Sequence, residues 1–214
     1  MTSPNDTPTI AISPSAGADP SACVASVERA GGRPVALAPD QTSALSRVGG
    51  LAVCGEGRAD ETVSPLLSAA LDAGLPVLCI GAGLHALNLA MGGKPAREVD
   101  GHAAVHGEGE SASSYHRIFI SPGSKLAAVV GSGGFVRVNS RHAEGLKEAG
   151  KSRLLAASAY SLDDGMIEAV ESTVHRWVIG VQFHPERRLE LPPHFDRLFQ
   201  SLVELAKEHE ETGA

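Results

Sequence analysis

The stretch Pro76–Gly93, "PVLCIGAGLHALNLAMGG", decides the fold. Its apolar start, Pro76–Ile80, predicts a buried strand, and Gly83–Gly93 predicts a helix that ends at paired glycines. A strand, a tight glycine turn and a helix form a nucleophile elbow, which lifts one side chain clear of the sheet beside a helix N-terminus. The residue at the tip is Gly81, so the predicted elbow has no side chain where a nucleophile would stand.

Apolar strands alternate with helical patterns through the rest of the first half. We expect strands at 9–13, 34–38 and 49–57, and helices at 19–32, where Asp19 or Ser21 would cap the N-terminus, and at 60–74. This alternation favours a doubly wound, mostly parallel sheet of the flavodoxin-like α/β class, with helices on both faces.

The second half has many strand patterns and few helices. Strands are expected at 113–121, 134–140, 152–160, 165–171 and 175–183, which indicates a strand-rich antiparallel extension. The polar segment 97–114 is expected to be a mobile loop, and an amphipathic helix should follow Pro192–Pro193. We therefore expect one domain over 8–208, a disordered tail at 1–7 and a frayed acidic tail at 209–214.

Composition narrows the partners and the compartment. The net charge of −7 and the lack of a basic run argue against nucleic acid or an anionic membrane as partner. Three scattered cysteines do not form a disulfide framework, and the N-terminus has no signal-peptide pattern. We expect a cytoplasmic protein.

A second motif, "GVQFHPE" at Gly180–Glu186, supports the interpretation of Pro76–Gly93 as a nucleophile elbow. With the segments "VERAGGRPVAL", "SPGSKLAAVVG", "VNSRHAEGLKEAG" and "DDGMIEAVE", it makes the chain resemble the class I glutamine amidotransferase-like superfamily. Within that superfamily, the chain is similar to the γ-glutamyl-γ-aminobutyrate hydrolase family from about Thr9 to Glu186. The resemblance implies a Cys-His-Glu triad in which His184 and Glu186 are the last two members and Gly81 takes the place of the cysteine.

Other residues of the motif region also depart from the family pattern. Ala82 stands where the family usually has Arg, and His85 where it usually has Gln. In "LAVCGEGRAD", Cys54 replaces the Pro and Glu56 replaces a Gly on either side of Gly55, in a turn whose backbone helps to form the oxyanion hole in the family. A carboxylate would oppose an oxyanion, where one donor is worth roughly 3 kcal/mol. The clustered changes indicate a site released from hydrolysis or rebuilt.

Another thiol could replace the missing nucleophile. Cys79 lies two residues before the tip, where a buried core position is the simpler interpretation. Cys54 ends a neighbouring strand and could face the same pocket. Cys23 lies in a predicted helix, and we expect it to pack far from the motif.

Several polar residues are candidates for ligand contacts. Asn139, Ser140 and His142 of "VNSRH" could form a wall of the cleft, His85 could hydrogen-bond a ligand, and Glu56 would favour a cationic group.

Metal ligation has weak support in the sequence. Six side chains could converge near one pocket: His85, His184, Glu56, Glu186, Cys54 and Cys79. His102 also lies four residues before His106, in a segment expected to be a loop. None of these has a tight ligand spacing, so neither a metal nor another cofactor is expected.

Three functions remain open. The first is a catalytically impaired hydrolase homologue that binds a small amine, a γ-glutamyl compound or a partner protein. The second is an active C–N hydrolase or amidotransferase that uses a different nucleophile. The third is a non-catalytic subunit that docks on a synthetase, and a homodimer is also open.

Overall fold

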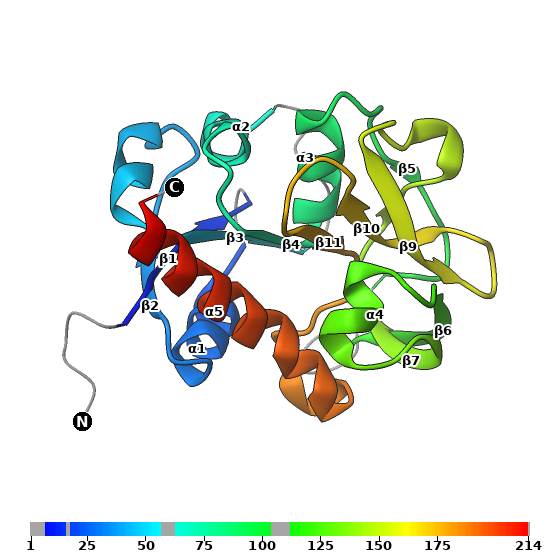
Figure 1. The fold of residues 1–214 in the computed structure, drawn as a ribbon. Coiled ribbons are helices and arrows are strands. Elements are labelled where there is room, and N and C mark those ends of the chain that lie inside the picture. Colours follow the sequence, from blue (N-terminus) through cyan, green and yellow to red (C-terminus); the bar gives the residue numbers. More distant parts are fainter. Residues whose placement is uncertain (1–6, 16–17, 57–62, 104–111, 214) are drawn as a thin grey trace.

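The computed structural model describes residues 7–15, 18–56, 63–103 and 112–213. A nine-stranded sheet runs through the molecule in the order β2-β1-β3-β4-β11-β10-β9-β6-β7 (Figure 1), and a small second sheet pairs β5 with β8. Neighbours from β2 to β11 are parallel, whereas neighbours from β11 to β7 are antiparallel. The expected α/β fold with an antiparallel extension is confirmed.

The parallel half alternates strands with helices, as its hydrophobic pattern predicts. Its elements are β1 (Thr9–Pro14), α1 (Ser21–Arg29), β2 (Arg33–Ala36), η2 (Thr42–Arg47), β3 (Gly50–Gly55), α2 (Pro65–Asp72), β4 (Val77–Gly81), α3 (Ala82–Ala90) and β11 (Val178–Val181). Because these strands are parallel, their carboxyl ends meet at one edge of the sheet, where open α/β folds bind their ligands.

The antiparallel half is built from hairpins. Its elements are β5 (Arg97–Glu98), β6 (Ser114–Ile120), α4 (Lys125–Val130), β7 (Gly134–Ser140), β8 (Glu144–Gly145), η3 (Glu148–Gly150), β9 (Leu155–Ser161), β10 (Ile167–Ser172) and η4 (Arg188–Glu190). Part of the expected loop at 97–114 is therefore strand, and 104–111 lies outside the described residues.

One strand has a different place from the one its sequence position suggests. Segment 175–183 was grouped with the antiparallel extension, yet β11 lies between the halves, parallel to β4 and antiparallel to β10. Since a short turn joins β10 to β11, they must pair antiparallel, and β11 then completes the parallel half. This places the segment after β11 beside the end of β4.

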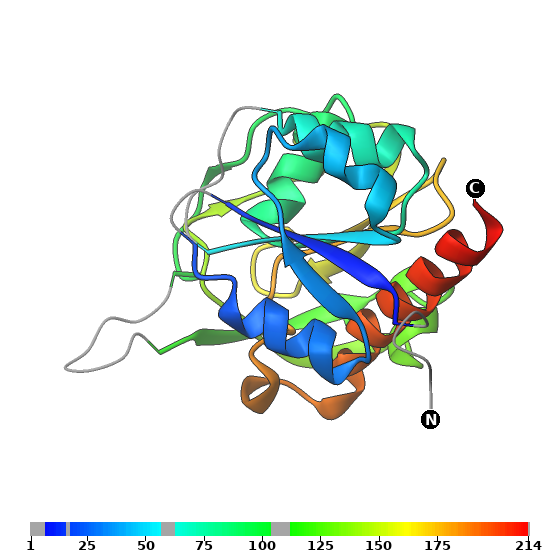
Figure 2. The same cartoon turned by 90° about the vertical axis from the view of Figure 1, so that its left-hand side faces the viewer.

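Helices cover both faces of the sheet. In Figures 1 and 2, α1, α4 and α5 lie on one face, and η2, α2 and α3 lie on the other. Because successive side chains of a strand point to opposite faces, β4 contributes to both cores. Leu78 and Ile80 pack toward α1, α4 and α5, and Val77 and Cys79 pack toward η2, α2 and α3. The site at the sheet edge is thus held by two buried cores.

Two helix ends differ in detail from expectation. Helix α1 begins at Ser21 with Pro20 as N-cap and no side-chain cap; Asp19 accepts from the Ser21 amide instead, one residue too early to cap. Helix α5 (Arg197–Thr212) follows η5 (Pro193–Asp196) and continues into the segment expected to be a frayed tail. Residues 1–6 of the expected N-terminal tail lie outside the described residues.

Candidate functional site

Gly81 forms a sharp turn between β4 and α3. Its backbone angles are φ 59° and ψ −120°, in a region that side chains rarely adopt and glycine adopts without a Cβ clash. It is the N-cap of α3, so the free amides of the first helical turn lie beside it. The predicted elbow therefore exists as local geometry.

A buried histidine–carboxylate pair lies after β11. The Nδ1 atom of His184 is 2.7 Å from Oε1 of Glu186, and His184 is 1% exposed. A carboxylate only accepts, so Nδ1 carries the proton and Nε2 carries a lone pair. The pair thus holds one tautomer of His184, as in a catalytic triad.

Asn139 fixes the backbone of this histidine. Its Oδ1 accepts from the His184 amide at 2.8 Å, and its Nδ2 donates to the His184 carbonyl at 3.1 Å. A second bond from Nδ2 reaches Oε2 of Glu190 at 2.8 Å. Asn139 therefore acts through His184, by holding its main chain.

The elbow tip and the histidine face each other. A Cβ placed on Gly81 would lie 2.8 Å from Cε1 and 3.2 Å from Nε2 of His184. It would also overlap the carbonyl oxygen of Gly55, which lies opposite Gly81 where β3 pairs with β4. Nε2 of His184 has no hydrogen-bond partner among the described residues. The basic nitrogen is thus aimed at a tip that carries only backbone.

Glu56 is paired with two arginines. Its Oε2 accepts from Nε of Arg141 at 3.0 Å, and its Oε1 accepts from Nη2 of Arg187 at 2.7 Å. Burial raises the pKa of Glu56, but these bonds and the nearby His184 lower it more, so the pKa lies below its usual value. The expected preference of Glu56 for a cationic ligand loses its basis, because guanidinium groups already compensate the carboxylate.

The three cysteines are buried free thiols. Cys79 is fully buried in the core under α2 and α3, and burial raises the pKa of its thiol well above the usual value. Cys54 lines a cleft beside Glu186, and its thiol and burial together raise the pKa of Cys23. The prediction that Cys23 packs far from the motif is wrong, because α1 lies over the end of β3 and brings it to Cys54.

Neither Ala82 nor His85 offers an exposed group to a ligand. Ala82 is 2% exposed in the first turn of α3, and His85 is 2% exposed one turn later. Burial lowers the pKa of His85 to about 4, against smaller opposing effects of Glu144 and Gln182. His85 is therefore a neutral buried imidazole at pH 7.

Ser140 and His142 lie on the other side of the chain from Asn139. Ser140 Oγ donates to the carbonyl of His102 at 2.7 Å, and His142 Nδ1 donates to the carbonyl of Glu144 at 2.7 Å. In extended chain, successive side chains alternate between faces. The "VNSRH" segment therefore contributes to two sites and does not form one wall.

Beyond the elbow lies a set that we call the imidazole cluster: His102, His116, His142 and Glu168. Glu168 Oε1 is 3.3 to 3.9 Å from a nitrogen of each ring. This cluster is absent from the sequence-based predictions above, although Glu168 is a charged residue within the apolar strand "MIEAV". Among the described residues, the group that could hold a metal is His102, His142 and Glu168, and none of the elbow residues considered for a metal belongs to it.

A cleft of about 440 Å³ opens next to the elbow. It is bounded by α1, the end of β3 and the segment after β11, and its lining includes Asp19, Cys23, Cys54, Glu56, Glu186 and Arg187. This is large enough for a small molecule. No helix in the described part of the chain is long and apolar enough to cross a membrane.

Comparisons with known proteins agree with this geometry. The Peptidase C26 family matches residues 54–186. A putative glutamine amidotransferase of Schizosaccharomyces pombe is 33% identical over 70% of this chain and 58% of its own length. The γ-glutamyl-γ-aminobutyrate hydrolase of Escherichia coli K12 is 31% identical over 56% of this chain and 50% of its own. The chain thus spans about half the length of these relatives.

A solved structure shows the same fold. The structure of PurLQS from Thermotoga maritima superposes with a TM-score of 0.69 at 15% identity, covering 92% of this chain and 98% of that one. The family match covers the end of β3, the elbow and the His184–Glu186 pair. The chain belongs to the Peptidase C26 family of the class I glutamine amidotransferase-like superfamily.

Proposed function

We propose that the chain is a catalytically impaired relative of the γ-glutamyl amide hydrolases, which binds a small amine or γ-glutamyl compound in the cleft beside the elbow. One observation carries this: Nε2 of His184 is oriented by Glu186 toward Gly81, where the resemblance puts the nucleophilic cysteine of the family. Nε2 of His184 can act as a base, but position 81 has no thiol for it to deprotonate.

The environment of the other thiols supports impairment. A thiol reacts as its thiolate, which burial in apolar surroundings disfavours. Cys79 lies in the core under α2 and α3 with a raised pKa. Cys54 is buried next to the thiol of Cys23, which offers it no positive charge.

The lining of the cleft supports a cationic ligand. Asp19 is exposed at its rim, and hydrogen bonds from Ser21 lower the pKa of the carboxyl group, so it is charged at pH 7. Glu56 is compensated by arginines, whereas Asp19 has the amide and hydroxyl of Ser21. We therefore assign the attraction for an amine to Asp19.

The test is release of glutamate or ammonia from glutamine and a panel of γ-glutamyl amides, with wild type and His184→Ala side by side. We expect no turnover by either protein. Calorimetric titration of the same compounds and of polyamines should show binding that Asp19→Asn weakens. The exposed pair of Arg176 and Glu208 provides the matched control, Glu208→Gln, which should leave binding unchanged.

Turnover that disappears in folded His184→Ala would overturn the proposed impairment. Cys54→Ser and Cys79→Ser would then identify the thiol responsible. No binding of any amine or γ-glutamyl compound would remove the ligand half of the proposal. An interaction subunit would then be the alternative, tested by co-purification from native lysate.

We also propose a cytoplasmic location. Cys23, Cys54 and Cys79 are free thiols, which suits a reducing compartment. Cell fractionation with an antibody against the chain tests this, and recovery in a secreted fraction would contradict it.

A further inference from the structure

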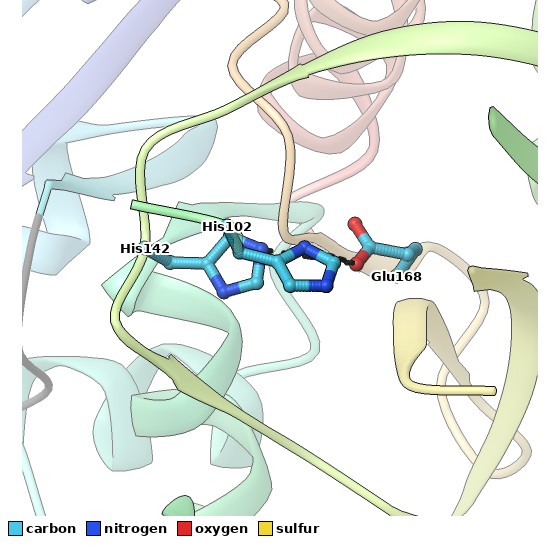
Figure 3. A group of neighbouring side chains, drawn as sticks. All are labelled: His102, His142 and Glu168. Carbon is cyan, nitrogen blue, oxygen red and sulfur yellow. Dashed lines mark ion pairs between the residues drawn. The ribbon is translucent and has the colours of Figure 1, made fainter. Parts of the chain in front are cut away.

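The imidazole cluster lies in the antiparallel half and comes from four segments. His102 precedes β6, His116 lies on β6, His142 follows β7 and Glu168 lies on β10. Figure 3 shows His102, His142 and Glu168 turned toward one another. One ligand atom from each of these three lies within 4.8 Å of the other two. Side chains so far apart in sequence meet because β6, β7, β9 and β10 form one continuous antiparallel sheet.

The cluster is buried, and its carboxylate lacks hydrogen bonds. The side chains of His102 and His142 are 6% and 2% exposed, and Glu168 is 0% exposed. Neither oxygen of Glu168 has a hydrogen-bond partner among the described residues, and nor does Nε2 of His142. A buried carboxylate is strongly destabilising unless a positive charge compensates it, and that charge is either a proton on His116, whose Nε2 lies 3.3 Å from Oε1, or a bound cation.

The outer nitrogens fix the tautomers of two rings. Nδ1 of His142 is 2.7 Å from the Glu144 carbonyl oxygen, which can only accept, so Nδ1 carries the proton. Nε2 of His102 is 3.1 Å from Oδ2 of Asp164, so it donates to that carboxylate. In the neutral rings, the lone pairs are therefore on Nε2 of His142 and Nδ1 of His102, the atoms that face Glu168.

The inner atoms repel one another. Nε2 of His142 and Nδ1 of His102 lie 3.8 and 3.9 Å from the same oxygen of Glu168. Two lone pairs and a carboxylate oxygen around one point are balanced by a cation at that point. Outer N–H groups held by a carbonyl and a carboxylate are also the usual second shell of metal-bound histidines.

A proton on one of the rings is the competing explanation. Nε2 of His116 is the ring nitrogen nearest to the carboxylate, 3.3 Å from Oε1 of Glu168, so His116 is the ring that would hold such a proton. A charged His116 would compensate Glu168 and would leave the two inner lone pairs opposed.

We propose that this cluster is a site for a divalent transition metal, Zn²⁺ first, bound by Nδ1 of His102, Nε2 of His142 and the carboxylate of Glu168. Two imidazoles and one carboxylate are a common ligand set for zinc. Zinc bonds of about 2.0–2.1 Å put tetrahedral ligands roughly 3.4 Å apart. The two nitrogens, now 3.8 and 3.9 Å from Oε1 of Glu168, need to approach it by about half an ångström, and the most distant pair of the three ligand atoms, within 4.8 Å, by up to about 1.4 Å. His116 is in reach as a fourth ligand.

The metal site is distinct from the elbow. Asn139 bonds the backbone of His184 and Arg141 bonds Glu56, whereas Ser140 and His142 contact the cluster. The two sites therefore lie on either side of the same extended segment. A metal here would tie β6, β7 and β10 together, and the site does not depend on the proposed function at the elbow.

The test is zinc binding by untagged full-length protein. Chelator-treated, dialysed protein is titrated with Zn²⁺ against a chromophoric competitor, and bound metal is counted by mass spectrometry. We expect one equivalent per chain and a loss of roughly a hundredfold or more in affinity for Glu168→Gln and His142→Ala. His209→Gln, on α5, is the matched control and should bind as wild type.

A milder variant guards against loss of folding. Asp164 is 34% exposed at its side chain; its Oδ2 accepts from the outer nitrogen of His102 and its Oδ1 accepts from the Met166 amide at 3.2 Å. An asparagine oxygen can still accept from Met166, so Asp164→Asn should fold and should bind zinc roughly 10–100-fold more weakly. Far-UV circular dichroism checks each variant. The proposal would be overturned if wild type did not bind zinc tightly, or if folded Glu168→Gln and Asp164→Asn bound zinc as tightly as wild type. A protonated His116 would then be the partner of Glu168.

Discussion

Two buried histidine sites flank the segment that follows β7, and they use the same device for different ends. At the elbow, Glu186 holds the proton of His184 on Nδ1, and the free nitrogen faces the backbone of Gly81. In the imidazole cluster, outer acceptors hold the protons of His102 and His142, and the free nitrogens face Glu168. An oriented histidine nitrogen therefore does not define the chemistry of a site by itself, because the group that the nitrogen faces also decides it.

The surroundings of the two lone pairs differ as well. The elbow is closed by main chain, since the carbonyl oxygen of Gly55 lies where a side chain at position 81 would begin. The cluster is enclosed by side chains from two strands, β6 and β10, and from two loop segments, and side chains shift more readily than main chain. We therefore expect substitutions at the elbow tip to act through backbone strain, and those at the cluster through charge.

The largest effect that sharpens this comparison is expected at the elbow tip. Gly81→Ala adds a Cβ at φ 59°, where it overlaps the Gly55 carbonyl and lies 2.8 Å from His184 Cε1. Strain at such positions costs about 1–3 kcal/mol, and crowding against backbone adds to it. We expect a loss of about 3 kcal/mol in the free energy of unfolding, measured by urea titration, and Gly81→Cys should lose a similar amount.

Gly74→Ala is the matched control. Gly74 has φ 68° after α2, and a Cβ there would meet nothing within 4 Å. It should cost about 1 kcal/mol, because only the conformational preference of glycine is lost. If Gly81→Ala and Gly74→Ala lost the same free energy of unfolding, crowding against the Gly55 carbonyl would not be what disfavours a side chain at position 81.

The fold class and the elbow could be predicted from sequence because both rest on patterns of neighbouring residues. A run of apolar residues, a glycine turn and helical periodicity are enough to place β4, Gly81 and α3. His184 and Glu186 were found through resemblance, since nothing local brings β11 next to β4. That pairing follows from the order of the strands in the sheet, which the alternation of elements leaves open.

The imidazole cluster could not be predicted for the same reason. Its members come from separate segments, and their meeting depends on the register of β6 against β7 and β9. His102 was noticed for its spacing from His106, whereas its contacts are with Asp164 and Glu168. A buried acidic residue in an apolar strand is the local signal to look for, because such a residue needs a partner from elsewhere.

The next effect concerns His85, which lies close to the elbow in the chain and acts electrostatically on the imidazole cluster. It lies on α3 after the elbow, and it contributes to the lowered pKa of His142. Its own pKa falls from 6.5 to about 4 through burial. Between those values the unfolded chain binds more protons than the folded one, so stability falls as pH drops.

His85→Gln should remove this dependence. Relative to wild type, the variant should lose on the order of 1–2 kcal/mol less stability between pH 6.5 and pH 5. Urea titrations at the two pH values measure this, with His209→Gln on α5 as control. An unchanged pH slope would mean that the buried ring at position 85 gains a proton in the folded state as readily as in the unfolded one.

The smallest effect is expected at Glu56, where the elbow is most open to solvent. Glu56 is 41% exposed at its side chain and bridges Arg141 and Arg187, so Glu56→Gln removes two ion pairs that water and salt screen. We expect a loss below about 1 kcal/mol at low salt, shrinking at high salt. Glu208→Gln removes one exposed pair with Arg176 and should cost less, since Arg141 is buried and Arg176 is not. If Glu56→Gln lost as much free energy of unfolding as Gly81→Ala, the ion pairs and not the backbone would hold the elbow closed. The contrast between backbone strain at the elbow tip and charge in the imidazole cluster would then be wrong.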